Sequence, residues 1–393
     1  MTTVDEQRAV AGPGQVDAAE VIRQAEALFD LIDSHGEEND REGRIAESVV
    51  EALYRIGAIG VFTPRELGGL EMTPRQSMDL FRTLSYADPS TGWVAMAMGL
   101  ATGLAGAFFD RATAEELFAT PRLSIAGQGT KPGRAVPVEG GHRISGDWSF
   151  ASGIKHSTHL HTAAQDTETG ETRFFIVPVE QVTFIENWDV LGLRGTGSID
   201  YTLEDCFVPI EYSYPSLSTE PVTGGGLYRI GIGNFASINH GGWVLGVGRR
   251  LLDELAAVVR AKAGRPGAQT DTTAFLEHFA KAEVELRAAK ALLYEVWEEI
   301  EQVLARGEEI PLRLHTLNRV ALHNATFSVA GIAQFVYTSA GTDALRRGTI
   351  QRLFRDVHGG TQHVSSSPLI MQAAGQELAG LAEGKRWVHF FLK

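Results

Sequence analysis

The hydrophobic positions change their spacing twice along the chain, and these changes divide it into three zones. Between residues 18 and 119, apolar side chains recur every three or four positions, which is typical of amphipathic helices. The clearest stripe consists of Val21, Ile22, Ala25, Leu28, Phe29 and Ile32. From about residue 121 to 218 the period becomes two, and from about residue 228 it is helical again. We therefore predict a helical domain over residues 1–119, a β domain over 120–222 and a helical bundle over 223–393.

Residues that start and stop helices support this division in the first zone. A helix is expected near residues 46–56, and Pro74 suits the first turn of the next one. The run Asp88-Pro-Ser-Thr91 indicates a stop followed by an N-cap. Residues 92–109 then carry no charge and are rich in Ala and Gly. This stretch approaches the length of a membrane span but lacks an anchoring basic flank, so we expect a buried helix.

The middle and last zones carry different signals. Strands are predicted over residues 141–150, 172–178 and 199–209, where β-branched and aromatic residues lie between Gly-rich turns. Later, one apolar face continues from Phe275 to Arg306, enough for a helix of about 45 Å. Helices of this length usually lie in bundles, often against a second subunit. The order of the zones, helical then β then helical, argues against alternating βαβ units. It predicts a mainly α protein with a central β barrel or sandwich.

The charge and the cysteine content narrow the class of protein. The 393 residues include 35 Lys and Arg and 49 Asp and Glu, a formal net charge of −14, so nucleic acid is not an expected partner. The single cysteine, Cys206, cannot form an internal disulfide, and no Cys/His pattern suits structural zinc. The first 14 residues lack the apolar core of a signal peptide. We expect a cytoplasmic protein without a membrane segment.

Three kinds of site, a dinucleotide site, a metal site and a serine hydrolase site, each have little support in the sequence. Residues 231–236 match GxGxxA, but Asp253 lies in a helical run where a dinucleotide fold needs a second strand. His156, His159 and His161 crowd together without an obvious further ligand, so structural roles are favoured over a metal site. No GxSxG elbow supports a serine hydrolase.

Residues 146–153, Gly-Asp-Trp-Ser-Phe-Ala-Ser-Gly, suit a flat ligand. On a continuous strand, Trp148, Phe150 and Ser152 would point to one side and present two aromatic faces and a hydroxyl. Such a strip suits a heteroaromatic ring that needs stacking and one hydrogen bond. An ordinary core strand with aromatic residues has the same pattern.

A second segment, residues 188–198, suits the polar part of a ligand. Gly195 and Gly197 would let the backbone approach closely, and Arg194, Thr196 and Ser198 offer donors for a phosphate or a ring carbonyl. A glycine-rich hairpin turn would have the same composition.

Several motifs taken together resemble one family. They are Gly68-Gly69, Asp88-Pro-Ser-Thr-Gly-Trp93, the 188–198 loop with Asp200 and Phe207-Val-Pro209, and Arg352-Leu-Phe-Arg-Asp356. Over nearly its whole length the chain resembles the acyl-CoA dehydrogenase superfamily, which implies an N-terminal helical domain, a β domain and a C-terminal four-helix bundle. The segment GxWxFxSG is most similar to group D of that superfamily, the two-component, reduced-flavin-dependent monooxygenases that include phenol and indole hydroxylases.

The chain departs from the dehydrogenases where they carry a catalytic carboxylate. That base is commonly a Glu just after the Arg-Asp pair, but the sequence here is Asp356-Val-His-Gly-Gly-Thr361. The alternative position falls near Ala236, and residues 234–247 contain no acid. Without a base, the dehydrogenase reaction has no first step. Instead, His363 follows seven residues after the Arg-Asp pair, which resembles the monooxygenase pattern.

The resemblance implies a reaction and catalytic residues. FADH2, or alternatively FMNH2, comes from a separate NAD(P)H-dependent flavin reductase and reacts with O2, and a flavin C4a-hydroperoxide transfers one oxygen atom to an aromatic, phenol-like or indole-like substrate. Ser152 is expected to contact flavin N5. His363 is expected to be the catalytic base, with His358 and His240 as competitors.

The same resemblance assigns the remaining flavin contacts. Phe150 should pack on the ring with Trp148 supporting it, and Arg260 is a weaker candidate for the phosphates of a neighbouring subunit's flavin. Residues along the ring edge or the phosphate portion would be Arg194, Thr196, Gly197 and Ser198. A homotetramer or homodimer is implied. The alternatives are an acyl-CoA dehydrogenase-type flavoprotein, an N- or S-oxygenase of an amino sugar or heterocycle, and a non-catalytic protein of this fold.

Overall fold

The structure is a computed structural model that describes residues 17–264 and 272–393. The first 14 residues, where no signal peptide is predicted, lie outside the described residues. The N-terminal part is helical, and the predicted first stripe is divided between two helices at Leu28. Its elements are α1 (Ala18–Ala27), α2 (Phe29–Glu42), α3 (Glu47–Arg55), η1 (Ala58–Gly60), η2 (Arg65–Leu67), α4 (Pro74–Ala87), α5 (Pro89–Phe108) and α6 (Arg111–Phe118).

Local capping fixes the two helices that matter most for the site. α4 begins with Pro74, and Thr73 and Gln76 form a capping box around its first turn. The Asp88 side chain accepts from Thr91 N at 2.9 Å and caps α5. Both predicted starts are confirmed.

α5 is the uncharged helix of the sequence. Its length and composition would allow a membrane span, but 78% of its most apolar window is buried inside the protein. A Cβ added at Gly103 would lie 2.5 Å from the Phe62 side chain, so α5 packs closely against the segment that follows η1. The prediction of a buried helix is confirmed.

The middle of the chain forms one mixed seven-stranded sheet in the order β5-β6-β2-β1-β3-β4-β7. β1 and β3 are parallel, and the other pairs are antiparallel. The three strands predicted from the sequence correspond to β2, β4 and β6. The elements are β1 (Ile125–Val138), β2 (Gly141–Trp148), η3 (Ile154–His156), β3 (His159–Asp166), β4 (Thr172–Pro178), η4 (Val179–Gln181), β5 (Thr183–Ile185), η5 (Arg194–Thr196), β6 (Asp200–Pro209), η6 (Ile210–Tyr212) and β7 (Ser213–Pro215).

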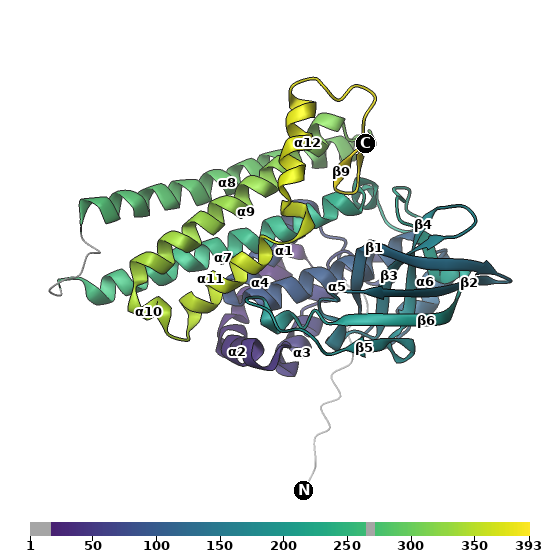
Figure 1. Ribbon diagram of the computed structural model, residues 1–393, viewed down its shortest axis with the longest axis horizontal. Coiled ribbons are helices and arrows are strands. Elements are labelled where there is room, and N and C mark those ends of the chain that lie inside the picture. Colours follow the sequence, from purple (N-terminus) through teal and green to yellow (C-terminus); the bar gives the residue numbers. More distant parts are fainter. Residues whose placement is uncertain (1–16, 265–271) are drawn as a thin grey trace, which may run out of the picture.

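The rest of the described chain is a helical bundle that extends away from the sheet (Figure 1). The predicted long helix is confirmed as α8, and α7 runs through the centre, packed on α4, α5, α9 and α11. The elements are η7 (Gly226–Ile230), α7 (Ile232–Lys262), α8 (Thr273–Ala305), α9 (Leu312–Ala340), α10 (Thr342–Leu345), α11 (Thr349–Gly360), η8 (Val364–Ser366), α12 (Pro368–Leu378) and the C-terminal hairpin β8 (Trp387–Val388) and β9 (Phe391–Leu392). The predicted mainly α architecture with a central β domain is confirmed.

Candidate functional site

The strand that carries the predicted aromatic strip ends earlier than expected. β2 stops at Trp148, whose ring stacks on Tyr201 at 5.2 Å and whose Nε1 donates to Ala163 O at 3.1 Å. Trp148 is only 2% exposed and belongs to the core of the sheet. The expectation that Trp148, Phe150 and Ser152 share one face is wrong, because the backbone turns at Phe150, where φ is 72°.

Phe150 projects from this turn towards solvent. Its side chain is 66% exposed, and its ring meets Trp188 edge to face at 6.1 Å. A positive φ is costly for an aromatic residue, and two backbone hydrogen bonds hold the turn: Ala151 N donates to Ile199 O at 3.1 Å, and Ser152 N donates to Phe150 O at 2.9 Å. An exposed aromatic ring on a fixed turn can stack on a planar ligand.

Three predicted hydroxyl residues form one chain of hydrogen bonds. Thr196 Oγ1 donates to Leu193 O at 2.7 Å, Ser198 Oγ lies 2.7 Å from Thr196 Oγ1, and Ser152 Oγ lies 2.7 Å from Ser198 Oγ. Each hydroxyl has one proton, and that of Thr196 goes to the carbonyl. Ser198 therefore donates to Thr196, and Ser152 donates to Ser198. This order leaves the Ser152 oxygen as an acceptor.

Trp93 reaches the same hydroxyl chain from α5, and sequence reasoning assigned it no role. Its Nε1 donates to Ser152 Oγ at 3.1 Å. Its ring packs against His240, Trp243 and His363, with centroid distances of 4.7, 5.1 and 5.9 Å; we call these four rings the aromatic cluster. The motif at residues 88–93 contains the signal, but no spacing in the sequence connects Trp93 with Ser152.

The predicted base His363 and one of its two competitors, His240, meet in the aromatic cluster. The ring centroids of His240 and His363 lie 4.0 Å apart. His363 Nδ1 accepts from Ser365 N at 3.2 Å, so Nε2 carries the proton of the neutral ring. Burial lowers the pKa of His363 to about 4, and burial together with His363 lowers the pKa of His240 well below its usual range. The His363 ring is therefore neutral at pH 7, and its role as the catalytic base stays a prediction.

The buried histidines predict acid sensitivity. Burial lowers the pKa of His161 to about 3 and those of His315 and His363 to about 4. An unfolded histidine titrates near 6.5, so between about pH 6.5 and pH 4 the unfolded state binds more protons. The free energy of unfolding should fall in this window as pH falls, by up to about 1.4 kcal/mol per pH unit for each histidine. Urea unfolding at several pH values measures this, and equal stability at pH 7 and pH 5 would contradict it.

Hydrogen bonds and close packing hold the 188–198 loop against α2. Arg194 Nε donates to Asp40 O at 3.1 Å, and its Nη1 donates to Asp189 Oδ1 at 3.0 Å. A Cβ added at Gly197 would lie 2.7 Å from Gly43 O, so this position has room only for glycine. The guanidinium and the glycine thus serve packing within the chain, and their contact with a flavin stays a prediction.

The Arg355-Asp356 pair of α11 holds the same loop from the other side. Asp356 Oδ1 accepts from Leu193 N at 2.6 Å, and Arg355 donates to Leu191 O at 2.8 Å. Arg355 also binds both carboxylate oxygens of Asp40 at 2.9 Å. Burial raises the pKa of Asp356 to about 7. This motif therefore anchors the loop that carries part of the hydroxyl chain.

Removing this anchor should destabilise the protein. In Asp356→Ala the buried Leu193 N–H loses its acceptor, and the free energy of unfolding should fall by about 1–3 kcal/mol. Asp356→Asn keeps an acceptor oxygen and should lose less. Asp189→Ala, which removes an exposed carboxylate of the same loop, serves as the matched control and should change stability by less than about 0.5 kcal/mol. Equal urea midpoints for the two Ala variants would contradict the anchoring role.

Two other candidate residues lie outside this arrangement. His358 Nδ1 donates to Phe354 O at 2.7 Å, and its ring lies on Phe354 at 4.3 Å, so it is bound to its own helix. Arg260 is exposed near the C-terminal end of α7, the end of the bundle away from the sheet (Figure 1). Its contact with a neighbouring subunit's flavin stays a prediction.

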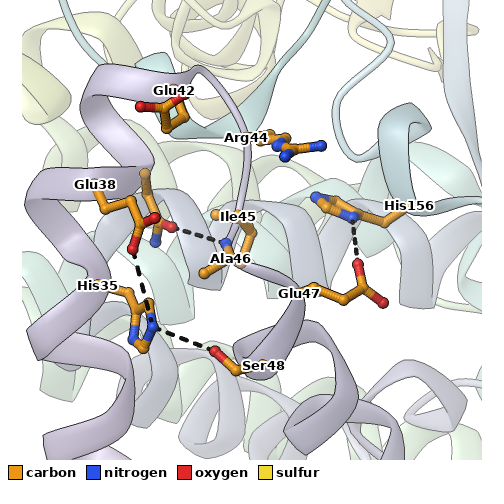
Figure 2. Close-up of a pocket in the computed structure, with 10 residues that line it drawn as sticks. His35, Glu38, Glu42, Arg44, Ile45, Ala46, Glu47, Ser48 and His156 are labelled. Atoms are coloured by element: carbon orange, nitrogen blue, oxygen red, sulfur yellow. Dashed lines mark hydrogen bonds and ion pairs between the residues drawn. The ribbon is translucent and has the colours of Figure 1, made fainter.

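A separate cavity of about 340 Å³ lies between α2, α3 and η3. In Figure 2, His156 Nδ1 faces Glu47 at 3.8 Å, and His35 lies between Glu38 and Ser48. Its lining contains neither the hydroxyl chain nor the aromatic cluster. Within the ranges that the structure describes, no group of three or more His, Cys, Asp or Glu side chains could hold a metal ion.

Two family models, one for each of two domains of the same protein family, match the chain. The acyl-CoA dehydrogenase N-terminal domain matches residues 22–117, and the acyl-CoA dehydrogenase C-terminal domain matches residues 238–368. The two matches together cover more than half of the chain, and the helices and loops that meet at the aromatic cluster include both matched regions.

Relatives and solved structures agree with these matches. An indole-3-acetate monooxygenase of Pseudomonas putida is 28% identical over 375 residues, 90% of this chain and 93% of the relative. The oxygenase subunit HsaA of a flavin-dependent monooxygenase from Mycobacterium tuberculosis is 28% identical over 372 residues, 90% of this chain and 93% of the relative.

The solved 3-HSA hydroxylase of Rhodococcus sp. RHA1 has a TM-score of 0.87 at 24% identity and covers 93% of this chain and 98% of its own. XiaF from Streptomyces sp., solved with FADH2 and glycerol, has a TM-score of 0.86 at 22% identity and covers 93% of this chain and 96% of its own. These similarities confirm the predicted fold.

Proposed function

The chain belongs to the acyl-CoA dehydrogenase family, and from this premise we propose that it is a reduced-flavin-dependent monooxygenase that transfers one oxygen atom from O2 to an aromatic small molecule. One observation carries the proposal. α7 has no Asp or Glu between residues 232 and 252, and its His240 packs against His363 and Trp93, whose Nε1 donates to Ser152 Oγ. A dehydrogenase needs a carboxylate base at such a place, whereas an oxygenase needs hydrogen-bond donors and protection from water.

The residues around Ser152 suit a reduced flavin. Phe150 and Trp188 offer aromatic surface, and the free acceptor position of Ser152 suits a ring N–H such as that at N5. Thr196 and Ser198 orient that acceptor through the hydroxyl chain. Bound reduced flavin supplies the electrons that activate O2, so one oxygen atom can reach the substrate and the other can leave as water. FADH2 is the proposed cofactor, with FMNH2 as the alternative.

We assign His363 a hydrogen-bonding role in this reaction. Its Nδ1 is occupied by Ser365 N, so the neutral ring offers Nε2–H as a donor. A donor at this place can bind a substrate hydroxyl or an oxygen atom during transfer. The pKa of about 4, caused by burial, keeps the ring neutral at pH 7, which fits a donor better than a base of matched pKa.

The aromatic cluster suits an aromatic substrate. Trp93 packs against both histidine rings and against Trp243, and the Phe390 ring of the C-terminal segment meets His363 at 6.3 Å. We further propose that a separate NAD(P)H-dependent reductase delivers the reduced flavin, and that the protein works in the cytoplasm as a homotetramer or homodimer. The long helices of the bundle supply the length of surface that such an assembly needs.

Flavin binding and oxygen use test the proposal. The protein should bind FADH2 or FMNH2 under anaerobic conditions more tightly than the oxidised flavin. When O2 and a phenol or an indole are added, an oxygenated product should form, with hydrogen peroxide as the minor outcome. A tightly bound yellow flavin that an acyl-CoA bleaches would instead identify a dehydrogenase, and a failure to bind reduced flavin would indicate a non-catalytic protein.

A further inference from the structure

A second pocket, of about 250 Å³, lies beside the C-terminal hairpin. Four segments line it: residues 216–219, the junction of η7 and α7, one turn of α9, and residues 386–389. Its positive charges are Arg229, Arg319 and Arg386, burial lowers the pKa of His315 and His389 beside them, and its lining includes no Asp or Glu. A concave surface with charge of one sign raises the local concentration of anions.

Arg319 is buried in the wall of this pocket, and no carboxylate of residues 17–264 or 272–393 pairs with it. Its side chain is 5% exposed and donates to Asn234 Oδ1 at 3.0 Å, to His315 O at 2.9 Å and to His389 O at 2.6 Å. The Trp387 ring covers the guanidinium at 4.5 Å, and Arg319 Nε has no hydrogen-bond partner within the described ranges. All three acceptors are neutral, so the buried charge is uncompensated, which is costly unless an anion binds.

The N-terminus of α7 adds positive potential to the same pocket. This helix has 31 residues, its N-cap is Gly231 with φ of 74°, no side chain caps it, and its first turn contains no acidic residue. The first residues of the helix, 232–234, line the pocket, and the hydroxyls of Ser218 and Thr219 lie in its opposite segment. Uncapped N–H groups at a helix N-terminus favour a bound anion.

We propose that this pocket binds an anionic group, a carboxylate or a phosphate, with Arg319 and the N-terminal N–H groups of α7 as fixed donors and Arg229 and Arg386 as charges at its rim. The fixed donors are held by the protein before the anion arrives, so little order is lost on binding. Arg229 is held by Gly307 O at 3.2 Å and has only a distant ion pair with Glu220, at 3.9 Å.

Two sources can supply such a group. A free phosphate has the required charge and size. The other source is the substrate, because α7 runs from Asn234 in the pocket to His240 in the aromatic cluster, roughly 9 Å along the helix. Phe390, which follows His389, also contacts His363. An aromatic molecule with an acidic side chain of several bonds would reach both places, and this second source rests on the proposed function.

Binding to the whole protein without flavin or O2 tests the pocket separately from the reaction. The probes are inorganic phosphate, phenylbutyrate and its uncharged counterpart phenylbutanol, titrated by calorimetry at constant ionic strength. The test variant is R229Q/R386Q, which changes two residues that are partly or fully exposed, and the matched control is Arg111→Gln on α6. Arg319→Gln is a third variant, and its melting temperature without anion reports whether it folds.

The wild type and Arg111→Gln should bind phosphate, phenylbutyrate or both, and R229Q/R386Q should bind the same probe about tenfold more weakly. If phosphate binds and its binding depends on these arginines, a free anion without an attached aromatic group is enough to occupy the pocket. Binding of phenylbutyrate alone, with phenylbutanol much weaker, identifies the acidic side chain of a larger ligand. Absence of binding by the wild type, or equal affinity in R229Q/R386Q, overturns the proposal. Neither result bears on flavin binding, so failure of this proposal is distinct from failure of the proposed function.

Discussion

Replacing His363 by Ala is expected to lower product formation about a hundredfold while the affinity for reduced flavin stays unchanged. The ring lies against Trp93 and His240 in the aromatic cluster, and its Nε2–H is the proposed donor to the reacting oxygen or to the substrate. The proposed flavin contacts involve Phe150 and Ser152 instead, so binding and turnover should separate. The measurement compares the anaerobic dissociation constant of reduced flavin with the product yield per flavin oxidised.

Two further variants separate the role of His363 from its part in the fold. His363→Asn keeps a side-chain acceptor for Ser365 N at the start of η8, so its stability should stay close to that of the wild type. His358→Ala serves as the matched histidine control. It removes a ring whose Nδ1 donates to Phe354 O within α11. His358→Ala should retain turnover, whereas His363→Asn should lose most of it. Full turnover by His363→Asn would remove His363 from the mechanism.

The pH profile of the same enzyme decides between a donor and a base. A base with an ordinary histidine pKa would make turnover fall as pH drops through about 6.5. Because burial lowers the pKa of His363 to about 4, a neutral donor should keep turnover level from about pH 8 to pH 5.5, apart from losses caused by unfolding. A falling limb near pH 6.5 that vanishes in His363→Asn would restore the role of base.

Replacing Ser152 by Ala is expected to shift the reaction from product towards hydrogen peroxide, with product yield falling about tenfold to a hundredfold. The hydroxyl chain leaves the Ser152 oxygen as an acceptor, which would hold the N5 hydrogen of a bound reduced flavin and so favour oxygen transfer over release of peroxide. The substitution also removes the acceptor of Trp93 Nε1, so the indole can move against the histidine pair. Product and peroxide are measured together in the same reaction.

Three further variants test whether the loss of product comes from the Ser152 hydroxyl itself. Ser152→Thr keeps the hydroxyl and should retain most of the product yield if the added methyl group fits. Ser198→Ala should give an intermediate effect, because Ser152 keeps its oxygen but loses the partner that orients its proton. Ser34→Ala, on the exposed face of α2, should change nothing. A product yield in Ser152→Ala equal to that of the wild type would show that the hydroxyl chain does not contact the flavin.

The sequence by itself determined the order of the helical and β regions and the positions of several elements within them. The change of hydrophobic period from helix to strand and back, Pro74, the Asp88 cap and the long face of α8 all depend on local rules, and the structure bears them out. The family resemblance rests on short motifs that survive as contiguous residues. The separate choices of Ser152 and of Thr196 with Ser198 as flavin contacts also followed from such motifs.

Only the tertiary structure decided which side chains meet. Ser152 and Trp93 are 59 residues apart, and a hydrogen bond joins them only because α5 packs against the turn that follows β2, where Gly153 meets Met98. Phe150 faces away from Trp148 because of one positive φ, which no alternation pattern reveals. Packing against rings from α5, α7 and the C-terminal segment lowers the pKa of His363, and Arg319 is buried among three neutral acceptors from different parts of the chain. Contact, burial and the resulting pKa values depend on segments distant in the chain, so local sequence cannot specify them.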